Sequence, residues 1–77
     1  MLKPVKTLDT VGLFCPEPLF QTKEALESLE IGEVLEVFAD DPAAEEDIKR
    51  YAKRTGHHLL VFEFKDGLLK FLLQKKK

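Results

Sequence analysis

The fold is decided by nine residues in the middle of the chain, VLEVFADDP at positions 34–42. Residues 34–38 are rich in apolar and β-branched side chains, which predicts a short strand covered on at least one face. The strand is expected to end at Asp40. Asp41 is a favourable N-cap, and Pro42 suits the first helical position, where its missing N–H would have had no partner. This stretch therefore predicts a strand that leads through a turn into a helix.

Downstream, that helix is expected to run from Pro42 to a stop at Gly56. Acidic residues at 45–47 precede basic residues between 49 and 54, an order that matches the helix macrodipole. Its predicted buried stripe consists of Ala44, Ile48, Tyr51 and Ala52. Residues 59–64 and 68–73 then flank Asp66-Gly67, a turn signal of the type I′ hairpin. The second half of the chain thus predicts a helix followed by a two-stranded hairpin.

Upstream, residues 5–8 predict a first strand, and a helix is expected over residues 16–29. The helix follows from the spacing of Leu19, Thr22, Leu26 and Leu29, with Glu30-Ile31-Gly32 as its stop. The element order is βαβαββ, which predicts an α+β two-layer sandwich with a four-stranded mixed sheet. Both helices are expected on one face, because so short a chain can hardly cover two. The other face is expected to carry polar residues or to meet a partner.

Composition narrows the possible functions. The chain of 77 residues has room for a single domain, 1–77, and its net charge of −2 does not favour nucleic acid as a partner. The basic residues Lys75–Lys77 are expected to be a frayed, solvated end. There is no apolar run long enough to span a membrane and no signal segment, so a cytoplasmic location is expected. A single cysteine agrees with a reducing compartment and leaves a free thiol to explain.

That thiol, Cys15, stands between Gly12 and the prolines Pro16 and Pro18, where the first helix is expected to begin. If Pro16 is the first helical residue, Cys15 is the N-cap, and the helix N-terminus favours its thiolate. Two prolines remove amides from that terminus and Glu17 adds a negative charge, so only a small depression of the thiol pKa is predicted. The prolines also predict a rigid, exposed thiol. The alternative is that Cys15 is a small buried core residue.

Two carboxylates are predicted to lie near this thiol. If the first two strands are parallel, their C-terminal ends share one edge of the sheet, which brings Cys15 close to the turn containing Asp40 and Asp41. Those aspartates are explained by the turn and the N-cap alone, or they form a functional pair.

Other constellations are weaker. Without a second cysteine there is no dithiol couple. His57 and His58 lie at the start of a strand and point to opposite faces, so no metal site is expected. The six phenylalanines fall mostly at strand or junction positions, which predicts that they belong to the core.

The sequence resembles the TusA/SirA family of small bacterial and archaeal sulfur carriers. The resemblance spans nearly the whole chain and rests on Leu8-Asp9, Gly12-Leu13, Cys15-Pro16-Glu17-Pro18, Asp40-Asp41-Pro42-Ala43, Asp47-Ile48 and Asp66-Gly67. It implies a βαβαββ sandwich in which the motif cysteine accepts sulfane sulfur as a persulfide, from a cysteine desulfurase or a rhodanese-type donor, and relays it to an acceptor protein without turnover of its own. Cys15 would be the persulfide site, with no cofactor or metal. Pro16, Glu17 and Pro18 would shape the site, with Gly12 in support, and Lys23, Asp40 and Asp41 would help partner docking.

Two alternatives stay open at this stage. The first is a non-enzymatic protein-interaction or regulatory module that uses the open sheet face, with Cys15 merely structural. The second is an RNA-binding α/β domain, for which the lysines at 75–77 are the only support. The sequence also leaves the final destination of the sulfur open, with tRNA thiolation as one possibility.

Overall fold

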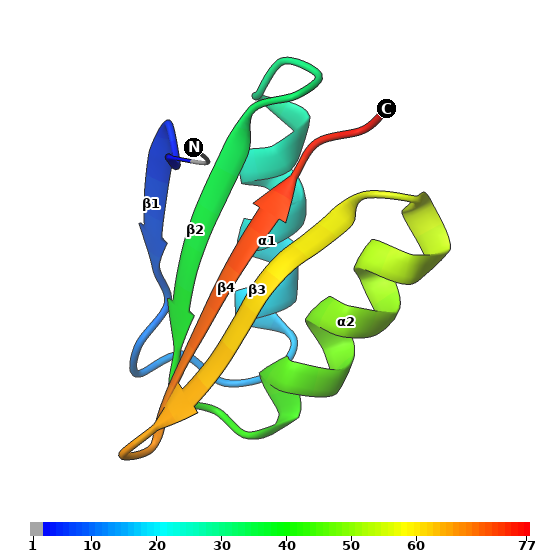
Figure 1. The fold of residues 1–77 in the computed structure, drawn as a ribbon. Helices are drawn as coiled ribbons and strands as arrows, with labels where there is room; N and C mark the ends of the chain where they lie inside the picture. The colour runs from blue at the N-terminus through cyan, green and yellow to red at the C-terminus, as the bar shows by residue number, and fades with distance from the viewer. Residues whose placement is uncertain (1–2) are drawn as a thin grey trace.

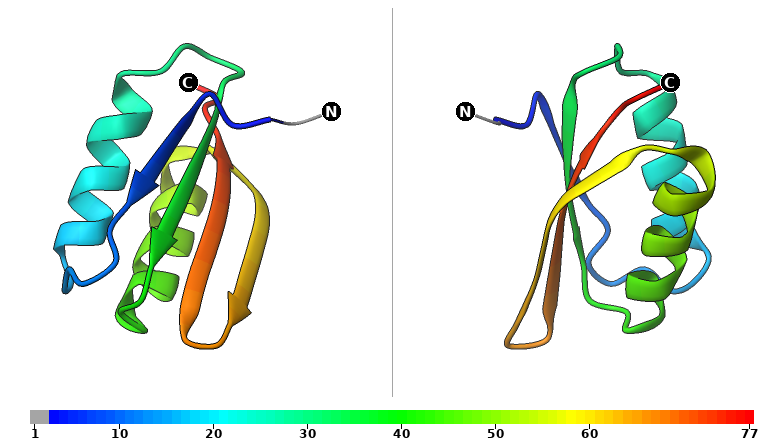
Figure 2. Two further views of the ribbon diagram at one scale, coloured as in Figure 1. Left: turned by 90° about the vertical axis from the view of Figure 1, so that its left-hand side faces the viewer. Right: turned by 45° about the vertical axis from the view of Figure 1, so that its right-hand side comes forward.

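A computed structural model of the protein describes residues 3–77. Its elements follow the order β1 (Lys6–Asp9), α1 (Glu17–Glu27), β2 (Val34–Ala39), α2 (Ala43–Thr55), β3 (His58–Lys65) and β4 (Leu68–Gln74). The strands form one sheet in the order β1-β2-β4-β3, with β1 and β2 parallel and the other neighbours antiparallel. Figures 1 and 2 show both helices on the same face of this sheet. The predicted two-layer α+β sandwich with a mixed sheet is confirmed.

The predicted strand-turn-helix unit is also confirmed. Strand β2 ends at Ala39, and Pro42 already has helical angles, φ −55° and ψ −29°, just before α2 begins. One carboxylate oxygen of Asp41 accepts a hydrogen bond from the Ala43 N–H at 3.1 Å, which is the capping role expected of it. At the other end, Gly56 adopts φ 86° and its N–H donates to the Ala52 carbonyl, as a C-terminal glycine does.

The core lies between the sheet and the two helices. Val37 of β2 pairs with Phe71 of β4, and Phe71 pairs in turn with Phe62 of β3. The rings of Phe62 and Phe71 lie 5.2 Å apart between centroids, in a tilted contact. Leu26 of α1 and Ile48 of α2 are fully buried against this layer. All four strands and both helices are therefore held by one apolar cluster.

Helix α1 is shorter than predicted at both ends. Pro16 has φ −99° and ψ 15°, which is not helical, so the helix begins at Glu17 and not at Pro16. The peptide bond between Cys15 and Pro16 is cis, and the Glu17 N–H donates to the Phe14 carbonyl at 2.8 Å. At the C-terminal end, the side-chain and backbone donors of Ser28 both bond the Ala25 carbonyl, which closes the helix early.

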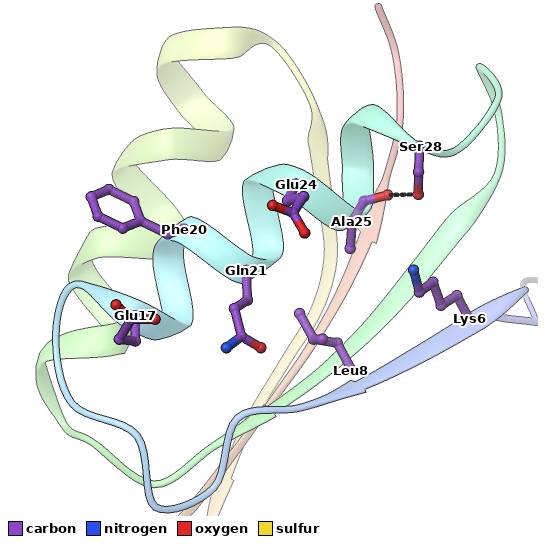
Figure 3. A pocket seen from close by; sticks show the side chains of 8 residues that line it. All are labelled: Lys6, Leu8, Glu17, Phe20, Gln21, Glu24, Ala25 and Ser28. Carbon is purple, nitrogen blue, oxygen red and sulfur yellow. Dashed lines mark hydrogen bonds between the residues drawn. The ribbon is translucent and has the colours of Figure 1, made fainter.

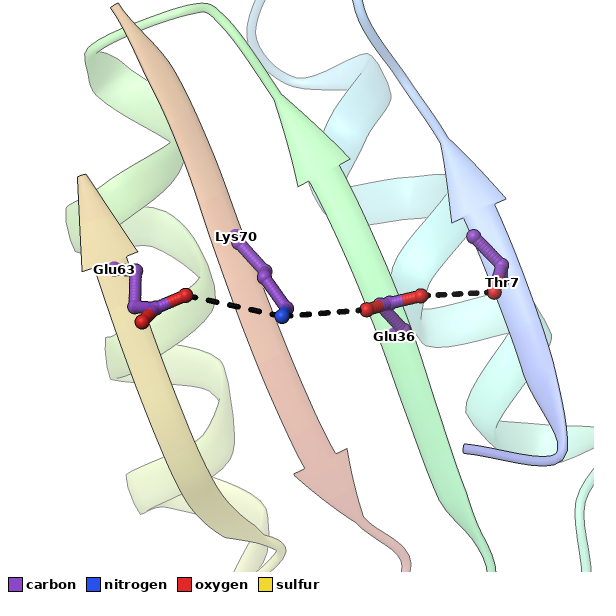
Figure 4. Close-up of polar contacts among 4 residues, drawn as sticks. All are labelled: Thr7, Glu36, Glu63 and Lys70. Carbon is purple, nitrogen blue, oxygen red and sulfur yellow. Dashed lines mark hydrogen bonds and ion pairs between the residues drawn. The ribbon is translucent and has the colours of Figure 1, made fainter. Parts of the chain in front are cut away.

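The face of the sheet opposite the helices carries a row of polar side chains. The sequence predicted that this face would either be polar or meet a partner, and the first of these is observed. Thr7 donates to Glu36 at 3.0 Å, and Lys70 lies 3.6 Å from Glu36 and 3.8 Å from Glu63. Figure 4 shows these side chains crossing all four strands. Such partly exposed ion pairs contribute little stability each, but they keep this face polar between its apolar residues.

Two residues of the basic C-terminal end, Lys75 and Lys76, are bonded to the rest of the fold, where the sequence predicted a frayed, solvated end. The Lys75 N–H donates to the Glu33 carbonyl at 2.9 Å, and its ammonium donates to the carbonyls of Leu29 and Glu27 at 2.7 and 3.2 Å. The Lys76 N–H donates to Nδ1 of His57 at 3.1 Å. Burial lowers the pKa of His57, and the charges of Lys75 and Lys77 lower it further, so the ring is kept in the neutral form that accepts this bond. The sequence could not show these contacts because they join distant parts of the chain.

Replacing Lys75 with methionine is expected to lower the free energy of unfolding by about 1 kcal/mol, because the ammonium bonds the carbonyls of Glu27, the last residue of α1, and of Leu29 just after it, where a cation is favourable. Methionine keeps the apolar stem, so urea denaturation reports the loss of the charged group. Lys76→Met is the matched control, since the bond of Lys76 to His57 comes from its backbone. Equal losses in the two variants would contradict the role given to the Lys75 ammonium.

Candidate functional site

The site is built on the loop that joins β1 to α1, which is fastened by contacts to β2 and to the turn after it. Thr10 is fully buried, and its N–H and hydroxyl both donate to the Phe38 carbonyl, at 2.8 and 2.7 Å. Asp40 accepts from the Gly12 N–H at 2.9 Å. Gly12 has φ 88°, a conformation that glycine adopts without strain. The loop is thus positioned by its neighbours as well as by its own proline, Pro16.

Cys15 is exposed and held from two directions. Its backbone N–H donates to a carboxylate oxygen of Asp41 at 2.7 Å, and its Sγ lies 2.9 Å from a carboxylate oxygen of Asp47. Figure 1 shows why these residues meet: β1 and β2 run in the same direction, so the loops leading to α1 and α2 lie at one edge of the sheet. The predicted proximity of Cys15 to the acidic turn is confirmed. Because the thiol is exposed, Cys15 is not a buried core residue.

The predicted role of Cys15 as N-cap of α1 is wrong. Pro16 occupies the position that flanks the helix, and no side chain among the described residues caps this end. The sulfur is bonded to Asp47 of α2 and receives no hydrogen bond from the first turn of α1. The amide of Glu17, which might have faced the thiolate, is already bonded to the Phe14 carbonyl.

The pKa of the Cys15 thiol is consequently raised, where the sequence predicted a small depression. The hydrogen bond to Asp47 is the largest cause, followed by desolvation and by the negative charges of Asp47 and Asp41. A carboxylate accepts hydrogen bonds and cannot donate them, so it favours the protonated thiol. The surroundings of Cys15 therefore favour the protonated thiol over the thiolate.

The other predicted site residues are placed around the thiol with different degrees of contact. Pro18 is buried in the first turn of α1, whereas Pro16 and Glu17 are exposed beside Cys15. Lys23 is exposed on α1, about two turns from Pro16. The structure therefore brings Asp40 and Asp41 into contact with the cysteine loop, and places Lys23 further along the helix.

Three of the six phenylalanines are exposed, which corrects the prediction that they belong to the core. Phe14, next to the cysteine, has 78% of its surface exposed, and Phe20 has 57%. Phe64, near the tip of the hairpin, is also exposed. Phe64 alternates with Phe62 along β3, whereas Phe14 lies in the loop before α1 and Phe20 lies off the buried stripe of that helix. Exposed aromatic residues beside a functional group are typical of a surface that meets another protein.

A groove of about 410 Å³ lies between β1 and α1 (Figure 3). It is lined by Lys6 and Leu8 from β1 and by Glu17, Phe20 and Gln21 among the residues of α1. Cys15 is not among the lining residues, so the groove is not the place where the thiol would react. The thiol lies instead on the exposed loop at the sheet edge.

Within residues 3–77 no group of three or more histidine, cysteine or acidic side chains is arranged to hold a metal ion. His57 contacts Tyr51 and the backbone of Lys76, and its neighbour His58 is exposed at the start of β3. Over the same part of the chain, no helix has the length and apolar character needed to cross a membrane.

Asp47 is the residue that the sequence-based choice of site missed. Its position gave a signal, because Asp47 lies three residues after Ala44 and four before Tyr51, both of which are buried. A residue so placed lies at the edge of the buried stripe, where a carboxylate faces the rest of the protein and not open solvent. Asp47 is half-buried in the structure.

Together, the fold and the site define a class: a small α+β protein that presents a single exposed thiol beside an acidic turn. Comparison with known proteins supplies the family. The sulfurtransferase TusA family matches residues 6–75, and the chain belongs to this family of sulfur carriers. The resemblance noted in the sequence is thereby confirmed.

Individual relatives agree with this assignment. An Archaeoglobus fulgidus protein named "Putative sulfur carrier protein" is 46% identical over 71 residues, which cover 91% of this chain and 92% of the relative. "Putative sulfur carrier protein YrkI" of Bacillus subtilis is 43% identical over 74 residues, covering 96% and 99% of the two chains. The crystal structure of a SirA-like protein from Desulfitobacterium hafniense has a TM-score of 0.81 and 27% identity, and covers 94% of this chain and 99% of that one.

Proposed function

We propose that this protein carries sulfane sulfur as a persulfide on Cys15, accepts it from a donor protein and delivers it to an acceptor protein. The observation that carries the proposal is the geometry of Cys15, the chain's only cysteine, exposed at the sheet edge on a loop fixed by Asp40 and Asp41. A thiol in a defined, accessible position suits transfer between proteins better than catalysis in an enclosed pocket.

The chemistry requires little more than this thiol. In the loading step, Sγ of Cys15 attacks the terminal sulfur of a donor persulfide. A new bond forms between Sγ and the terminal sulfur, and the S–S bond of the donor breaks. The donor's own cysteine sulfur leaves as a thiolate, which takes up the proton lost by Cys15. The sulfane sulfur is transferred from the donor to Cys15 without any external oxidant or reductant. Delivery to the acceptor thiol repeats the exchange, and neither step uses a metal or a cofactor.

The surroundings of Cys15 favour contact with a protein partner. Phe14 presents an exposed ring immediately beside the thiol, and Asp40 and Asp41 form the acidic side of the same surface. Apolar contact with charged groups at the rim is the usual composition of a transient interface. Lys23 and the two aspartates are the residues we assign to docking. The donor is a cysteine desulfurase or a rhodanese-type protein, and tRNA thiolation is one destination for the sulfur.

The function is tested by loading. Incubation with a cysteine desulfurase and cysteine is expected to add one sulfur mass to the wild-type protein, measured on the intact chain. Cys15→Ser keeps the size of the side chain but offers no thiol, so it is expected to gain no sulfur. A wild type of unchanged mass with desulfurase and rhodanese-type donors alike, or equal loading of the serine variant, would refute the proposal.

A further inference from the structure

The thiol of Cys15 donates a hydrogen bond to the carboxylate of Asp47. The carboxylate has no proton of its own to donate in return. Sγ lies 2.9 Å from a carboxylate oxygen of Asp47, which stands on α2, 32 residues further along the chain. The adjoining backbone N–H of Cys15 is bonded to Asp41 at 2.7 Å. The charged groups that act on the sulfur from α2 and from the turn before it are therefore both negative.

This arrangement distinguishes the two protonation states of the sulfur. The protonated thiol donates to Asp47, whereas a thiolate has no proton to donate and is repelled by both carboxylates. A third acidic residue, Glu17, lies at the start of α1, two positions after Cys15 in sequence. His57 does not offset these negative charges near the sulfur, because it is bonded to Lys76 next to the C-terminal end of α2.

We propose that Asp47 is a positioning residue that holds the empty carrier as a protonated, weakly reactive thiol and releases the side chain once sulfur is loaded. This inference rests on the proposed carrier function of Cys15 and adds a difference between the empty and loaded states. Protonated cysteine is a poor nucleophile, so an exposed Cys15 is protected from small electrophiles while it waits for a donor protein.

The release on loading follows from the atoms involved. In the persulfide, Sγ is bonded to Cβ and to the added sulfur and carries no hydrogen, so the bond from Sγ to Asp47 no longer exists. The added sulfur lies about 2 Å beyond Sγ. In its anionic form this sulfur is repelled by Asp47 and Asp41, which turns the loaded side chain outward to the surface where an acceptor arrives. Asp47 thus holds the unloaded thiol by a hydrogen bond and repels the anionic persulfide.

The closing experiment measures the rate of alkylation of Cys15 by iodoacetamide, a small neutral electrophile, from about pH 6 to about pH 10. Asp47→Asn removes the charge at nearly constant shape, and Asp47→Ala removes the acceptor as well. Both variants are expected to react about threefold faster than wild type at pH 7, the size of effect that one exposed charge interaction produces. Their rate profiles move to lower pH, because the thiol pKa falls when the carboxylate is removed. The difference between the rates is expected to narrow towards the upper end of this pH range, as the wild-type thiol also ionises.

Glu46→Gln is the matched control, because it removes the same charge one residue away. The Glu46 side chain is 83% exposed, and within residues 3–77 its one ion pair is with Arg50, at 3.9 Å. Its rate profile is expected to coincide with that of the wild type. Coincidence of the Asp47 variants with wild type would overturn the proposal, and so would an equal shift in Glu46→Gln, which would indicate a general charge effect.

The loaded state is tested by the carboxyl ¹³C signal of Asp47, recorded before and after loading with inorganic polysulfide. Loading is expected to move the signal towards its position in Cys15→Ala, where no thiol bonds the carboxylate. A signal that stays at the empty-state position would overturn the release on loading. Iodoacetamide needs no sulfur donor, so a normal alkylation result with no loading by any donor protein would refute the carrier function alone.

Discussion

Phe71→Ala is expected to lower the free energy of unfolding by about 3–5 kcal/mol, the largest stability effect predicted for this protein. Phe71 is fully buried at the centre of the sheet, where it pairs with Val37 on one side and Phe62 on the other. Removing the ring leaves a cavity between the sheet and both helices. A chain of 77 residues has a total stability of only about 4–12 kcal/mol, so the loss removes a large part of it.

The measurement is urea denaturation followed by circular dichroism, with Phe14→Ala as the matched control. The chemical change is the same, but Phe14 is 78% exposed, so its loss is expected to stay within about 0.5 kcal/mol of wild type. If Phe71→Ala proves too unstable to purify, Phe71→Leu is expected to show a smaller loss in the same direction. Similar stabilities for the two alanine variants would contradict the assignment of the core.

Asp41→Ala is expected to slow sulfur loading by about 10- to 100-fold, because this carboxylate fixes the backbone of the reacting residue. One oxygen of Asp41 accepts from the Cys15 N–H at 2.7 Å, and the other accepts from the Ala43 N–H at 3.1 Å. The negative charge of Asp41 also raises the thiol pKa, so its removal increases the thiolate fraction. That gain is only a few-fold for an exposed charge, and loss of position is expected to dominate.

Loading by the desulfurase is measured as a rate, with Asp40→Ala as the comparison. Asp40 contacts the Gly12 N–H, three residues from the thiol, so a smaller decrease is expected. Asp41→Ala also removes the capping bond at the start of α2, which costs about 0.5–2 kcal/mol and is monitored by denaturation. Loading at the wild-type rate by a folded Asp41→Ala protein would contradict the positioning role.

Most of the fold could be predicted from local patterns. The run at 34–42 predicted β2 and the start of α2, and Asp66-Gly67 predicted the hairpin, where both residues have positive φ, 52° and 80°. These signals are local because backbone preference and capping depend on residues adjacent in sequence. The ends of α1 were predicted less well. They depend on the non-helical conformation of Pro16 and on the bonds from Ser28 to Ala25.

The chemical state of the thiol could not be predicted in the same way. At 26 and 32 residues from Cys15, Asp41 and Asp47 reach it only after β1 and β2 have paired. The same limit applies to Lys75, which was predicted to belong to a frayed end but bonds the carbonyl of Leu29, 46 residues away and just after α1. In each case the energy comes from a contact between distant segments, which no local preference reveals.

The order of elements, the two-layer sandwich and the single thiol at the entry to the first helix could all be inferred from the sequence. These follow from periodicity, turn chemistry and composition, which are local or additive properties. The surroundings of that thiol depend on the three-dimensional arrangement, which places two carboxylates from the β2–α2 side there in place of the amides of a helix N-terminus. The reason is physical, because the pKa of Cys15 depends on which charges lie within a few ångströms of the sulfur, and the parallel pairing of β1 with β2 sets that distance.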